Sequence, residues 1–337
     1  MCHNTYGSFV CSCVDGYHLD PNGITCRYSG AIDKKLILTT RDGIHLIKPM
    51  EKHQSIKDVR LLLGNLNNPV ALDFDWSENC IYWSEMTEVS TFIKRYCVSL
   101  DSVSVNQSDD QSLDIQILHS NTLQSPDGIA VDWIGRNLYW CDRGKSTIEV
   151  SKLNGKFRRV LIKSNLEEPH AIVLNPLEGL MFWTDWGERP YIGRASMDGS
   201  DVRVLLEESL GWPNALSIDF IKRELYYADA REDYIGVIDF DGKRRSILFN
   251  GKTRYTSHIF ALVYFESRLY WTDWHSNSVV SCPVYNCTIN HFVPQTTIHR
   301  PTDIKMLHPE HQPSLPADTK NPCSTQHGCL SLCLLKQ

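Results

Sequence analysis

The chain has 337 residues, a formal net charge of −6 and 22% charged residues, which is enough for one large core with small flanking units. The charges are spread without runs of one sign, which argues against nucleic acid or an anionic membrane surface as a partner. No apolar run is long enough for a transmembrane helix, and no basic and apolar leader follows Met1. Neither a membrane span nor a signal peptide is therefore expected.

Twelve cysteines, clustered towards both ends of the chain, indicate an oxidising, extracellular compartment. A chain that reaches this compartment needs a secretion signal. We therefore expect this sequence to be an internal piece of a longer secreted or membrane-anchored protein.

Residues 1–28 begin with the pattern C-x-N-T-x-G-S-F-x-C-x-C, which runs from Cys2 to Cys13 and is followed by Cys26. This pattern resembles the second half of an epidermal-growth-factor-like module. The resemblance implies a Cys13–Cys26 disulfide, and it implies that Cys2 and Cys11 have partners that lie before Met1. It also puts Asn4 at a calcium-coordinating position, where oxygen ligands suit this cation. Because the acidic residues of that subtype are not in this chain, a turn-capping role for Asn4 is the alternative, and calcium is the only cofactor expected.

Residues 31–309 are organised around a degenerate Tyr-Trp-Thr-Asp signature. Its five copies are Tyr82-Trp83-Ser84-Glu85, Tyr139-Trp140-Cys141-Asp142, Phe182-Trp183-Thr184-Asp185, Tyr226-Tyr227-Ala228-Asp229 and Tyr270-Trp271-Thr272-Asp273. The leading aromatic residues are 57, 43, 44 and 44 residues apart. A period near 44 with strand-forming residues at each copy is typical of a β-propeller.

Each repeat also predicts four strands. A chain-turning residue stands thirteen positions before each leading aromatic and is followed by alternating apolar positions, which indicates a strand that begins at a turn. These residues are Pro69, Pro126, Pro169, Pro213 and, more weakly, Ser257. The aromatic strand and a third strand follow. Turns such as Asn154-Gly155 or Asp198-Gly199 then lead to a short fourth strand. Four antiparallel strands make one propeller blade.

Two incomplete repeats predict how the ring closes. The segment from Leu36 to Thr40 is a degenerate copy one period before Tyr82, and it lacks the preceding alternating strand. The segment from Pro301 to Leu307 is such a strand in the right phase, but no aromatic signature follows it. We therefore predict an all-β, six-bladed propeller in which this C-terminal segment completes the blade that begins at Leu36. Closure removes the free sheet edges.

The repeated signature residues are predicted to be structural. The aromatic residues are expected to fill the core between blades, and the aspartates to accept hydrogen bonds from the backbone of the adjoining blade, because a buried carboxylate needs partners. The departures at Ser84-Glu85 and at Tyr227-Ala228 are expected to weaken single contacts between blades. The structural set is Tyr82, Trp83, Tyr139, Trp140, Asp142, Trp183, Asp185, Tyr226, Asp229, Tyr270, Trp271 and Asp273.

Five further cysteines lie within the propeller. Cys80 and Cys97 stand at opposite ends of a predicted hairpin, which predicts a cross-strand disulfide. Cys282 and Cys287 flank a turn and are predicted to pair in the same way. Cys141 is then left as a buried free thiol that behaves as a small apolar residue.

Two sequons are candidate glycosylation sites. Asn106 lies in a polar insertion at residues 98–116, which explains the one long spacing between signatures. Asn286 is the second candidate, although its sequon has a cysteine at the central position.

Residues 310–320 are rich in proline and polar residues and are predicted to be a linker. Residues 321–337 then place cysteines at positions 323, 329 and 333. They resemble the opening half of another growth-factor-like module, and this resemblance implies a Cys323–Cys333 disulfide.

The order of module, propeller and module resembles the low-density lipoprotein receptor family, and within it the large members of the receptor-related protein 1 type. The stretches that carry the resemblance are residues 137–142, 147–155, 228–235, 299–301 and 329–335. The resemblance implies a cell-surface endocytic receptor with this chain on the extracellular side of the plasma membrane. Its propeller would space the ligand modules, bind protein ligands such as lipoprotein cargo or neighbouring modules, and help to release cargo in acid. The membrane would be reached only through the parent chain.

Histidines offer a physical route to acid release, because imidazole gains charge near pH 6. His170 and His258, beside the starts of predicted strands, are the candidates, and ordinary histidines without a switching role are the alternative. A matrix protein or a Wnt-co-receptor-like signalling scaffold is a competing function. An enzyme is the other one, since six-bladed propellers also host hydrolases. No motif assembles the nonrepeating acids into a catalytic site, so no catalytic residue is predicted. These acids are Glu167, Glu168, Glu207, Glu208, Glu232 and Asp233.

Overall fold

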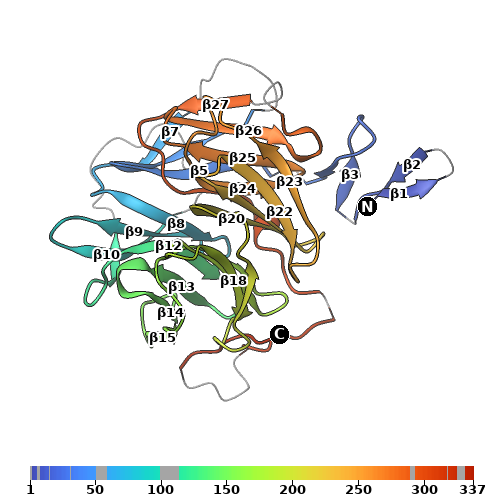
Figure 1. Ribbon diagram of the computed structural model, residues 1–337. Coiled ribbons are helices and arrows are strands. Elements are labelled where there is room, and N and C mark those ends of the chain that lie inside the picture. Colours follow the sequence, from blue (N-terminus) through green and yellow to red (C-terminus); the bar gives the residue numbers. More distant parts are fainter. Residues whose placement is uncertain are drawn as a thin grey trace.

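Six four-stranded antiparallel sheets form a ring in the computed structural model of the chain (Figure 1). The structure describes residues 2–5, 8–14, 16–30, 32–50, 59–98, 114–288, 293–316, 318–324 and 331–337. The part of the chain that it describes contains no α-helix, only short 3-10 turns such as η1 (Arg143–Lys145), η2 (Val284–Asn286) and η4 (Pro309–His311). In those residues, no helical segment has the length and apolarity needed to span a bilayer.

Each sheet is one blade, and the inner strands of neighbouring blades pack against one another. From inner to outer strand, blade 1 is β28 (Ile304–Leu307), β5 (Lys35–Thr40), β6 (Gly43–Ile47) and β7 (Val59–Leu63). Blade 2 is β8 (Pro69–Asp75), β9 (Cys80–Met86), β10 (Thr91–Cys97) and β11 (Gln116–His119). Blade 3 is β12 (Pro126–Asp132), β13 (Asn137–Asp142), β14 (Thr147–Lys152) and β15 (Arg159–Ile162).

The second half of the ring repeats this order. Blade 4 is β16 (Pro169–Asn175), β17 (Leu180–Asp185), β18 (Tyr191–Ser196) and β19 (Arg203–Leu206). Blade 5 is β20 (Pro213–Asp219), β21 (Glu224–Asp229), β22 (Tyr234–Asp239) and β23 (Arg245–Asn250). Blade 6 is β24 (Ile259–Phe265), β25 (Arg268–Asp273), β26 (Ser278–Pro283) and β27 (Val293–Thr297).

Blade 1 closes the ring as the sequence predicts. Strand β28 pairs antiparallel with β5, with Ile304 opposite Leu38 and Leu307 opposite Lys35. Leu36 and Leu38 are fully buried, because β5 lies between β28 and β6 in its sheet and these side chains pack against blade 6. The expected fold, an all-β six-bladed propeller, is confirmed.

The signature aromatic residues fill the core between blades. Trp183 of blade 4 is fully buried and shares one apolar cluster with Ala130, Tyr139 and Cys141 of blade 3. Trp140 and Trp271 are equally buried in the corresponding clusters with the preceding blade. The repeat therefore stabilises the ring chiefly through burial of large aromatic surfaces.

The signature aspartates tie down the connecting loops. Asp185 accepts hydrogen bonds from the backbone N–H groups of Glu167 and Glu168, both at 3.0 Å. Asp142 and Asp229 each accept two such bonds, and Asp273 accepts one from His258. Backbone partners are as expected, but they lie in the loop that leads from the preceding blade into the aspartate's own inner strand.

The departures from the signature have different consequences. The Ser84 hydroxyl accepts a hydrogen bond from the Ala71 N–H at 3.1 Å, as the Thr184 hydroxyl does from Ala171 in blade 4. Glu85 accepts from the Trp83 indole at 2.7 Å. Glu85 also accepts from the Asn67 N–H of the preceding loop at 3.4 Å, one bond that is longer than the two at 3.0 Å that Asp185 accepts from its loop. The expected weakening at Ser84-Glu85 therefore stays a prediction. Ala228, at the same position in blade 5, has no hydroxyl to accept such a hydrogen bond.

Disulfides join the four cysteine pairs that the sequence predicts, and Cys141 is buried and free. The pairs are Cys13–Cys26, Cys80–Cys97, Cys282–Cys287 and Cys323–Cys333. The expectation that the partner of Cys11 lies before Met1 is wrong, because Cys11 is disulfide-bonded in this chain. The pairing of β1 (Cys2–Thr5) with β2 (Ser8–Cys11) places the Cys2 backbone opposite Cys11.

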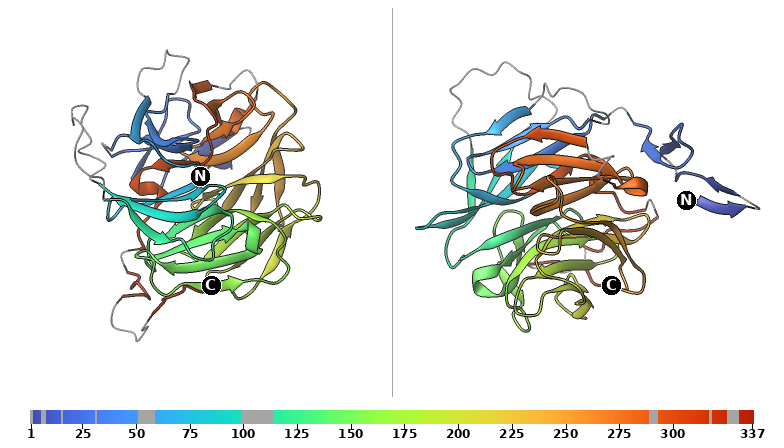
Figure 2. Two further views of the ribbon diagram at one scale, coloured as in Figure 1. Left: turned by 90° about the vertical axis from the view of Figure 1, so that its left-hand side faces the viewer. Right: turned by 45° about the horizontal axis from the view of Figure 1, so that its top comes forward.

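The N-terminal module projects from the side of the ring (Figures 1 and 2). Its inner hairpin, β3 (Tyr17–Leu19) and β4 (Cys26–Tyr28), contacts the propeller through polar bonds. The Tyr28 N–H donates to Glu266 Oε1 at 2.8 Å, and Lys34 forms an ion pair with Glu266 Oε2 at 2.6 Å. The Tyr17 hydroxyl donates to Glu310 Oε2 at 3.1 Å.

Residues 310–316, within the segment that the sequence predicts to be a linker, contact the propeller closely. The His311 ring stacks on Phe74, with centroids 6.2 Å apart. Gln312 Oε1 accepts from the Trp76 N–H at 2.9 Å, and the Trp133 indole donates to the Pro313 carbonyl at 2.9 Å. Composition alone does not reveal these partners, because they come from turns far away in the sequence.

The last seven residues also pack on the propeller. Leu335 is 7% exposed and belongs to the core cluster between blades 3 and 4. Asn137 Nδ2 donates to the Cys333 carbonyl at 2.7 Å, and Arg194 donates to Gln337 Oε1 at 2.6 Å. Both flanking segments therefore contact the same face of the ring.

Candidate functional site

The propeller has two faces, which are defined by the ends of its inner strands. The turn face carries the hairpin turns that follow the inner strands, and it holds the contacts of both flanking segments described above. The loop face carries the loops that lead from each blade into the next inner strand. Functional loops on a rigid scaffold are the usual site of binding, so the loop face is the candidate.

Six aromatic rings form a connected patch on the loop face, which we call the aromatic patch. Its residues come from blades 4, 5 and 6 and are Trp186, His170, Phe260, Trp274, His258 and Trp212, in order of contact. The centroids of neighbouring rings lie between 3.9 Å (His170 and Trp186) and 6.3 Å (Trp212 and His258). Trp212 is 45% exposed and Trp274 is 39% exposed.

Hydrogen bonds fix two of these rings. The Trp186 indole donates to the Pro213 carbonyl at 3.1 Å, and the Trp274 indole donates to the Pro301 carbonyl at 2.6 Å. In each case the acceptor lies where the chain enters the next inner strand. The rings are thus held in place before any partner binds.

The mouth of the central channel lies beside the aromatic patch and contains buried polar atoms without partners. Asn214 Nδ2 donates to the Ile259 carbonyl at 2.9 Å, while its Oδ1 has no partner among the described residues. Both ring nitrogens of His170 are also unpartnered there. Burial raises the pKa of Asp127 to about 6, although it pairs with Arg143. The mouth can accept a polar group from a partner.

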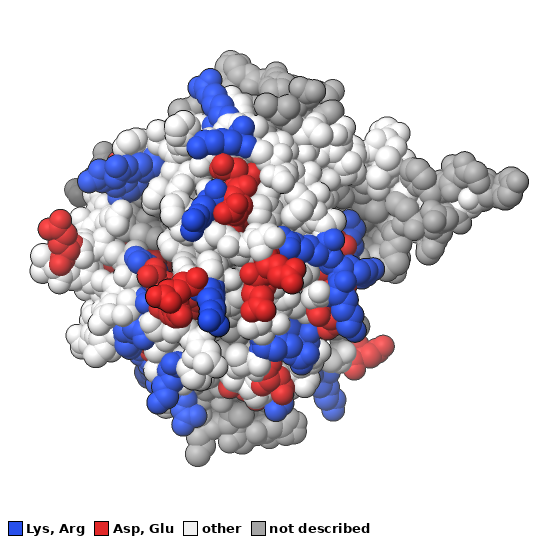
Figure 3. All heavy atoms as spheres, in the orientation of Figure 1, with Lys and Arg blue, Asp and Glu red and all other residues white. Residues whose placement is uncertain are grey.

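The nonrepeating acids lie at or near the surface. Five of them are exposed and Asp233 is partly buried; the exposed ones are Glu167, Glu168, Glu207, Glu208 and Glu232. No group of three or more potential metal ligands occurs among the residues that the structure describes. Acidic and basic side chains are interspersed on the face drawn in Figure 3.

The two candidate switch histidines differ in their surroundings. His170 is buried, and burial together with the charge of Arg143 lowers its pKa to about 3. The expectation that His170 gains charge near pH 6 is therefore wrong for the folded chain. His258 is half-buried, and burial lowers its pKa from the usual value, while Asp273 and Asp233 act in the opposite direction.

The remaining site predictions stay predictions. The backbone of Asn4 lies in β1, but its side chain is outside the described residues, so calcium binding is untested. Asn106 also lies outside the described residues. Asn286 is exposed at the end of η2, next to the buried Cys287.

A family profile decides the identity of the repeat. The profile of the low-density lipoprotein receptor repeat class B matches residues 136–176 and 179–220. The first range contains β13 to β16 and the second contains β17 to β20, so each covers three strands of one blade and the inner strand of the next. These residues carry low-density lipoprotein receptor class B repeats. The family is a receptor-type propeller family and not a known enzyme family.

Two curated relatives of this chain are a receptor and a receptor-related protein by name. The chain is 30% identical to the vitellogenin receptor Yl of Drosophila melanogaster over 344 residues, which is 100% of this chain and 16% of that receptor. It is 41% identical to a human low-density lipoprotein receptor-related protein 5-like protein over 164 residues, covering 49% of this chain and 64% of that protein. The chain therefore spans only part of each relative.

Solved structures agree with the class B repeat fold. A chain from the crystal structure of a nidogen/laminin complex has a TM-score of 0.69 and 27% identity, covering 82% of this chain and 98% of that chain. TolB from Acinetobacter baumannii has a TM-score of 0.59 at 8% identity, covering 81% of this chain and 66% of that chain, so it shows the fold alone.

The aromatic patch was not predicted from the sequence of this class B repeat chain, although a signal was present. Trp186 and Trp274 each follow a signature aspartate directly, and Trp212 directly precedes the proline of the next inner strand. Trp186 and Trp274 lie just outside the four-residue signature, so they are not among the residues that the repeat places in the core. Their recurrence in two repeats is the clue that identifies the loop face.

Proposed function

We propose that this chain is a protein-binding segment of the ectodomain of a cell-surface endocytic receptor, and that the propeller binds its ligand on the loop face. The observation that carries the proposal is the connected, partly exposed aromatic patch. The relatives support it, because one of them is named as a receptor for vitellogenin.

The physical argument rests on the aromatic side chains. Tryptophan dominates many protein interfaces because its large ring loses much water-exposed surface on binding while its N–H still finds a partner. Trp186 and Trp274 already have that partner in the propeller backbone. Rings that are fixed in advance lose little conformational freedom on binding, and this favours affinity.

Binding measurements with single variants test the proposal. Vitellogenin and a lipoprotein particle are immobilised, and the purified chain is titrated over each by biolayer interferometry. Trp212→Ala and Trp274→Ala should each weaken binding by about ten-fold or more, as expected for interface tryptophans. Phe157→Ala is the matched control, because Phe157 is a similarly exposed aromatic residue in a turn on the opposite face. Equal affinities for all three variants would refute use of the loop face.

A matrix or signalling scaffold is the second candidate, and the similarity to a chain of the nidogen/laminin complex favours it. A laminin fragment in the same assay separates the two. Binding of the laminin fragment alone favours the scaffold. Binding of the lipid-carrying proteins, with uptake of labelled cargo by cells that express the parent receptor, favours the endocytic receptor.

Acid-dependent release is proposed through His258, which stacks on Trp274 with centroids 5.4 Å apart. Protonation of this ring would place a charge inside the aromatic patch and change the surface that the ligand meets. His258→Gln should then reduce the loss of affinity between about pH 7.4 and pH 5.5. A wild-type chain that binds equally at both values would show that no release occurs here.

A further inference from the structure

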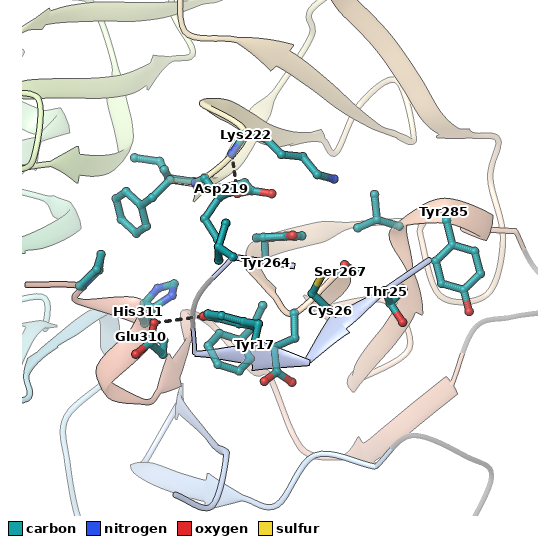
Figure 4. Close-up of a pocket in the computed structure, with 18 of the residues that line it drawn as sticks. Tyr17, Thr25, Cys26, Asp219, Lys222, Tyr264, Ser267, Tyr285, Glu310 and His311 are labelled. Atoms are coloured by element: carbon teal, nitrogen blue, oxygen red, sulfur yellow. Dashed lines mark hydrogen bonds between the residues drawn. The ribbon is translucent and has the colours of Figure 1, made fainter. Parts of the chain in front are cut away.

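A cavity of about 460 Å³ lies between the N-terminal module and the turn face of the propeller (Figure 4). The module lines it with Val14, Tyr17 and Ile24, and the propeller lines it with residues such as Ile221 and Tyr264. Most of this lining is apolar, and the volume is in the range of small-molecule sites. The cavity is separate from the aromatic patch, which lies on the loop face.

One buried carboxylate lines this cavity without being fully partnered. Asp219 is the last residue of β20 and is 4% exposed. Its Oδ1 atom accepts hydrogen bonds from the N–H groups of Ile221 and Lys222, both at 3.0 Å. Its Oδ2 atom has no partner among the described residues. A buried carboxylate oxygen without a donor is costly, so this atom is suited to a donor from a ligand.

The equivalent aspartates of two other blades have a side-chain donor that Asp219 lacks. Asp75 and Asp132 stand at the corresponding ends of β8 and β12. Asp75 Oδ2 accepts from Arg136 of the next blade at 2.5 Å, and Asp132 Oδ2 accepts from Asn137 of its own blade at 3.0 Å. Both equivalents of Asp219 thus have a side-chain donor.

Neither donor is retained around Asp219. The position equivalent to Asn137 is Glu224, and the position equivalent to Arg136 is Ser267. An ionised glutamate has no proton to donate, and serine is much shorter than arginine. Burial raises the pKa of Glu224, and the charge of Asp219 adds to this rise. The charges of Lys222 and Arg244 act against this rise, but neither side chain donates to Asp219 Oδ2 among the described residues.

Aromatic rings complete the polar end of the cavity. The Tyr264 hydroxyl lies beside Asp219: burial, the charge of Asp219 and a side-chain contact with Asp219 all raise its pKa, although the contact does not have hydrogen-bond geometry at Oδ2. Its ring stacks on Tyr226, with centroids 4.8 Å apart. A carboxylate near electron-rich rings is a favourable environment for an ammonium group.

We propose that this cavity is a binding site for a small amphipathic amine, whose ammonium group donates to Asp219 Oδ2 and whose apolar body lies among Val14, Ile24 and Ile221. The negative charge of Asp219 favours a ligand with an ammonium group, and the apolar walls favour a ligand whose remaining part is apolar. The bound molecule touches both the module and the propeller. It therefore stabilises their attachment to each other.

Calorimetric titration of the whole chain with three ten-carbon probes tests the site. Decylamine should bind at least about ten-fold more tightly than decanol or decanoate, because a charged hydrogen bond contributes roughly this factor or more. Asp219→Asn keeps the Oδ1 acceptor for Ile221 and Lys222 but removes the charge, so it should weaken decylamine alone. Glu207→Gln, at an exposed position on another part of the ring, is the matched control and should change nothing.

Ile221→Trp gives an independent reading. Ile221 is 49% exposed and lines the cavity, so a larger side chain there can fill the space without entering the core. All three probes should then lose affinity. Equal binding of the three probes to the wild-type chain would overturn the proposal. So would unchanged decylamine affinity in either variant, or binding seen only where decylamine forms micelles.

Discussion

The hydroxyl of Tyr17 donates a hydrogen bond to the carboxylate of Glu310, across 293 residues of sequence. It joins the N-terminal module to the segment that follows the last propeller strand. The same segment is held by the propeller through Gln312 and Pro313. The position of the module therefore depends on a stretch of chain that is synthesised long after it.

Tyr17→Phe should loosen this attachment. It removes a hydrogen bond to a charged acceptor, which contributes about 1.5–3 kcal/mol when the partner is ionised. Hydrogen exchange measured by mass spectrometry should become faster in residues 16–30 and stay unchanged in β12 to β23. Tyr285→Phe is the control, because Tyr285 is exposed on the propeller side of the same cavity. Unchanged exchange in Tyr17→Phe would mean that the other contacts, those of Glu266 and the packing of Tyr28 on His308, hold the module without it.

Asp185→Ala should destabilise the propeller more than any change to an exposed acid. Three backbone N–H groups, those of Glu167, Glu168 and Gly187, lose a charged acceptor. We expect a decrease of about 3 kcal/mol in the free energy of unfolding, measured by urea denaturation. Glu207→Ala should lie within about 0.5 kcal/mol of the wild-type chain. A similar value for both variants would contradict the anchoring role of the signature aspartate.

The buried His170 should make stability fall in acid. Its pKa is lowered to about 3 in the folded chain, so between that value and about 6.5 the unfolded chain binds the additional proton. Its contribution is complete above pH 6.5 and decreases as the pH falls. His170→Phe removes this dependence without breaking a hydrogen bond among the described residues, where both ring nitrogens are unpartnered.

The expected size follows from the linkage relation. Between pH 7 and pH 5 the wild-type chain should lose about 2 kcal/mol more free energy of unfolding than His170→Phe. Urea denaturation of both proteins at several pH values measures the difference. Parallel pH profiles would show that the ring is protonated in the folded state at pH 5, against the burial that the structure shows.

The two propeller disulfides should differ in their contribution. Cys80–Cys97 closes a loop with a sequence separation of 17, and Cys282–Cys287 closes one of 5. The chain-entropy relation gives about 3 kcal/mol for the first and about 2 kcal/mol for the second. Replacing both cysteines of each pair by alanine, followed by thermal and urea denaturation, checks the order. The opposite order would mean that local packing outweighs loop closure.

The ring was predictable because it is encoded redundantly. The aromatic signature and the strand-starting proline repeat in phase, so the two half-blades at Leu36 and Pro301 could be matched without coordinates. The attachment of residues 310–316 was not predictable in this way. His311 and Gln312 find their partners at Phe74 and Trp76, and such contacts between distant turns leave no periodic trace in a single sequence.

Among the candidate sites, too, the local features were predictable and the contacts between distant segments were not. The disulfide at Cys80 and Cys97 was predictable, because the register of one hairpin places them opposite each other. The aromatic patch was not predicted, since it combines rings from three blades that only the closed ring brings together. The environment of His170 was misjudged for the same reason: its neighbours Trp186 and Phe260 belong to two different blades.

The pairing of β28 with β5 sets the order of events during translation. Strand β5 leaves the ribosome early, but its inner partner, residues Ile304–Leu307, follows more than 250 residues later. Until then blade 1 has an exposed inner edge, and the nascent ring remains open. Such long-range pairing folds slowly and exposes strand edges that favour aggregation. The five blades between them can form as the chain grows, but the protein becomes a closed ring only when this last short strand has been made.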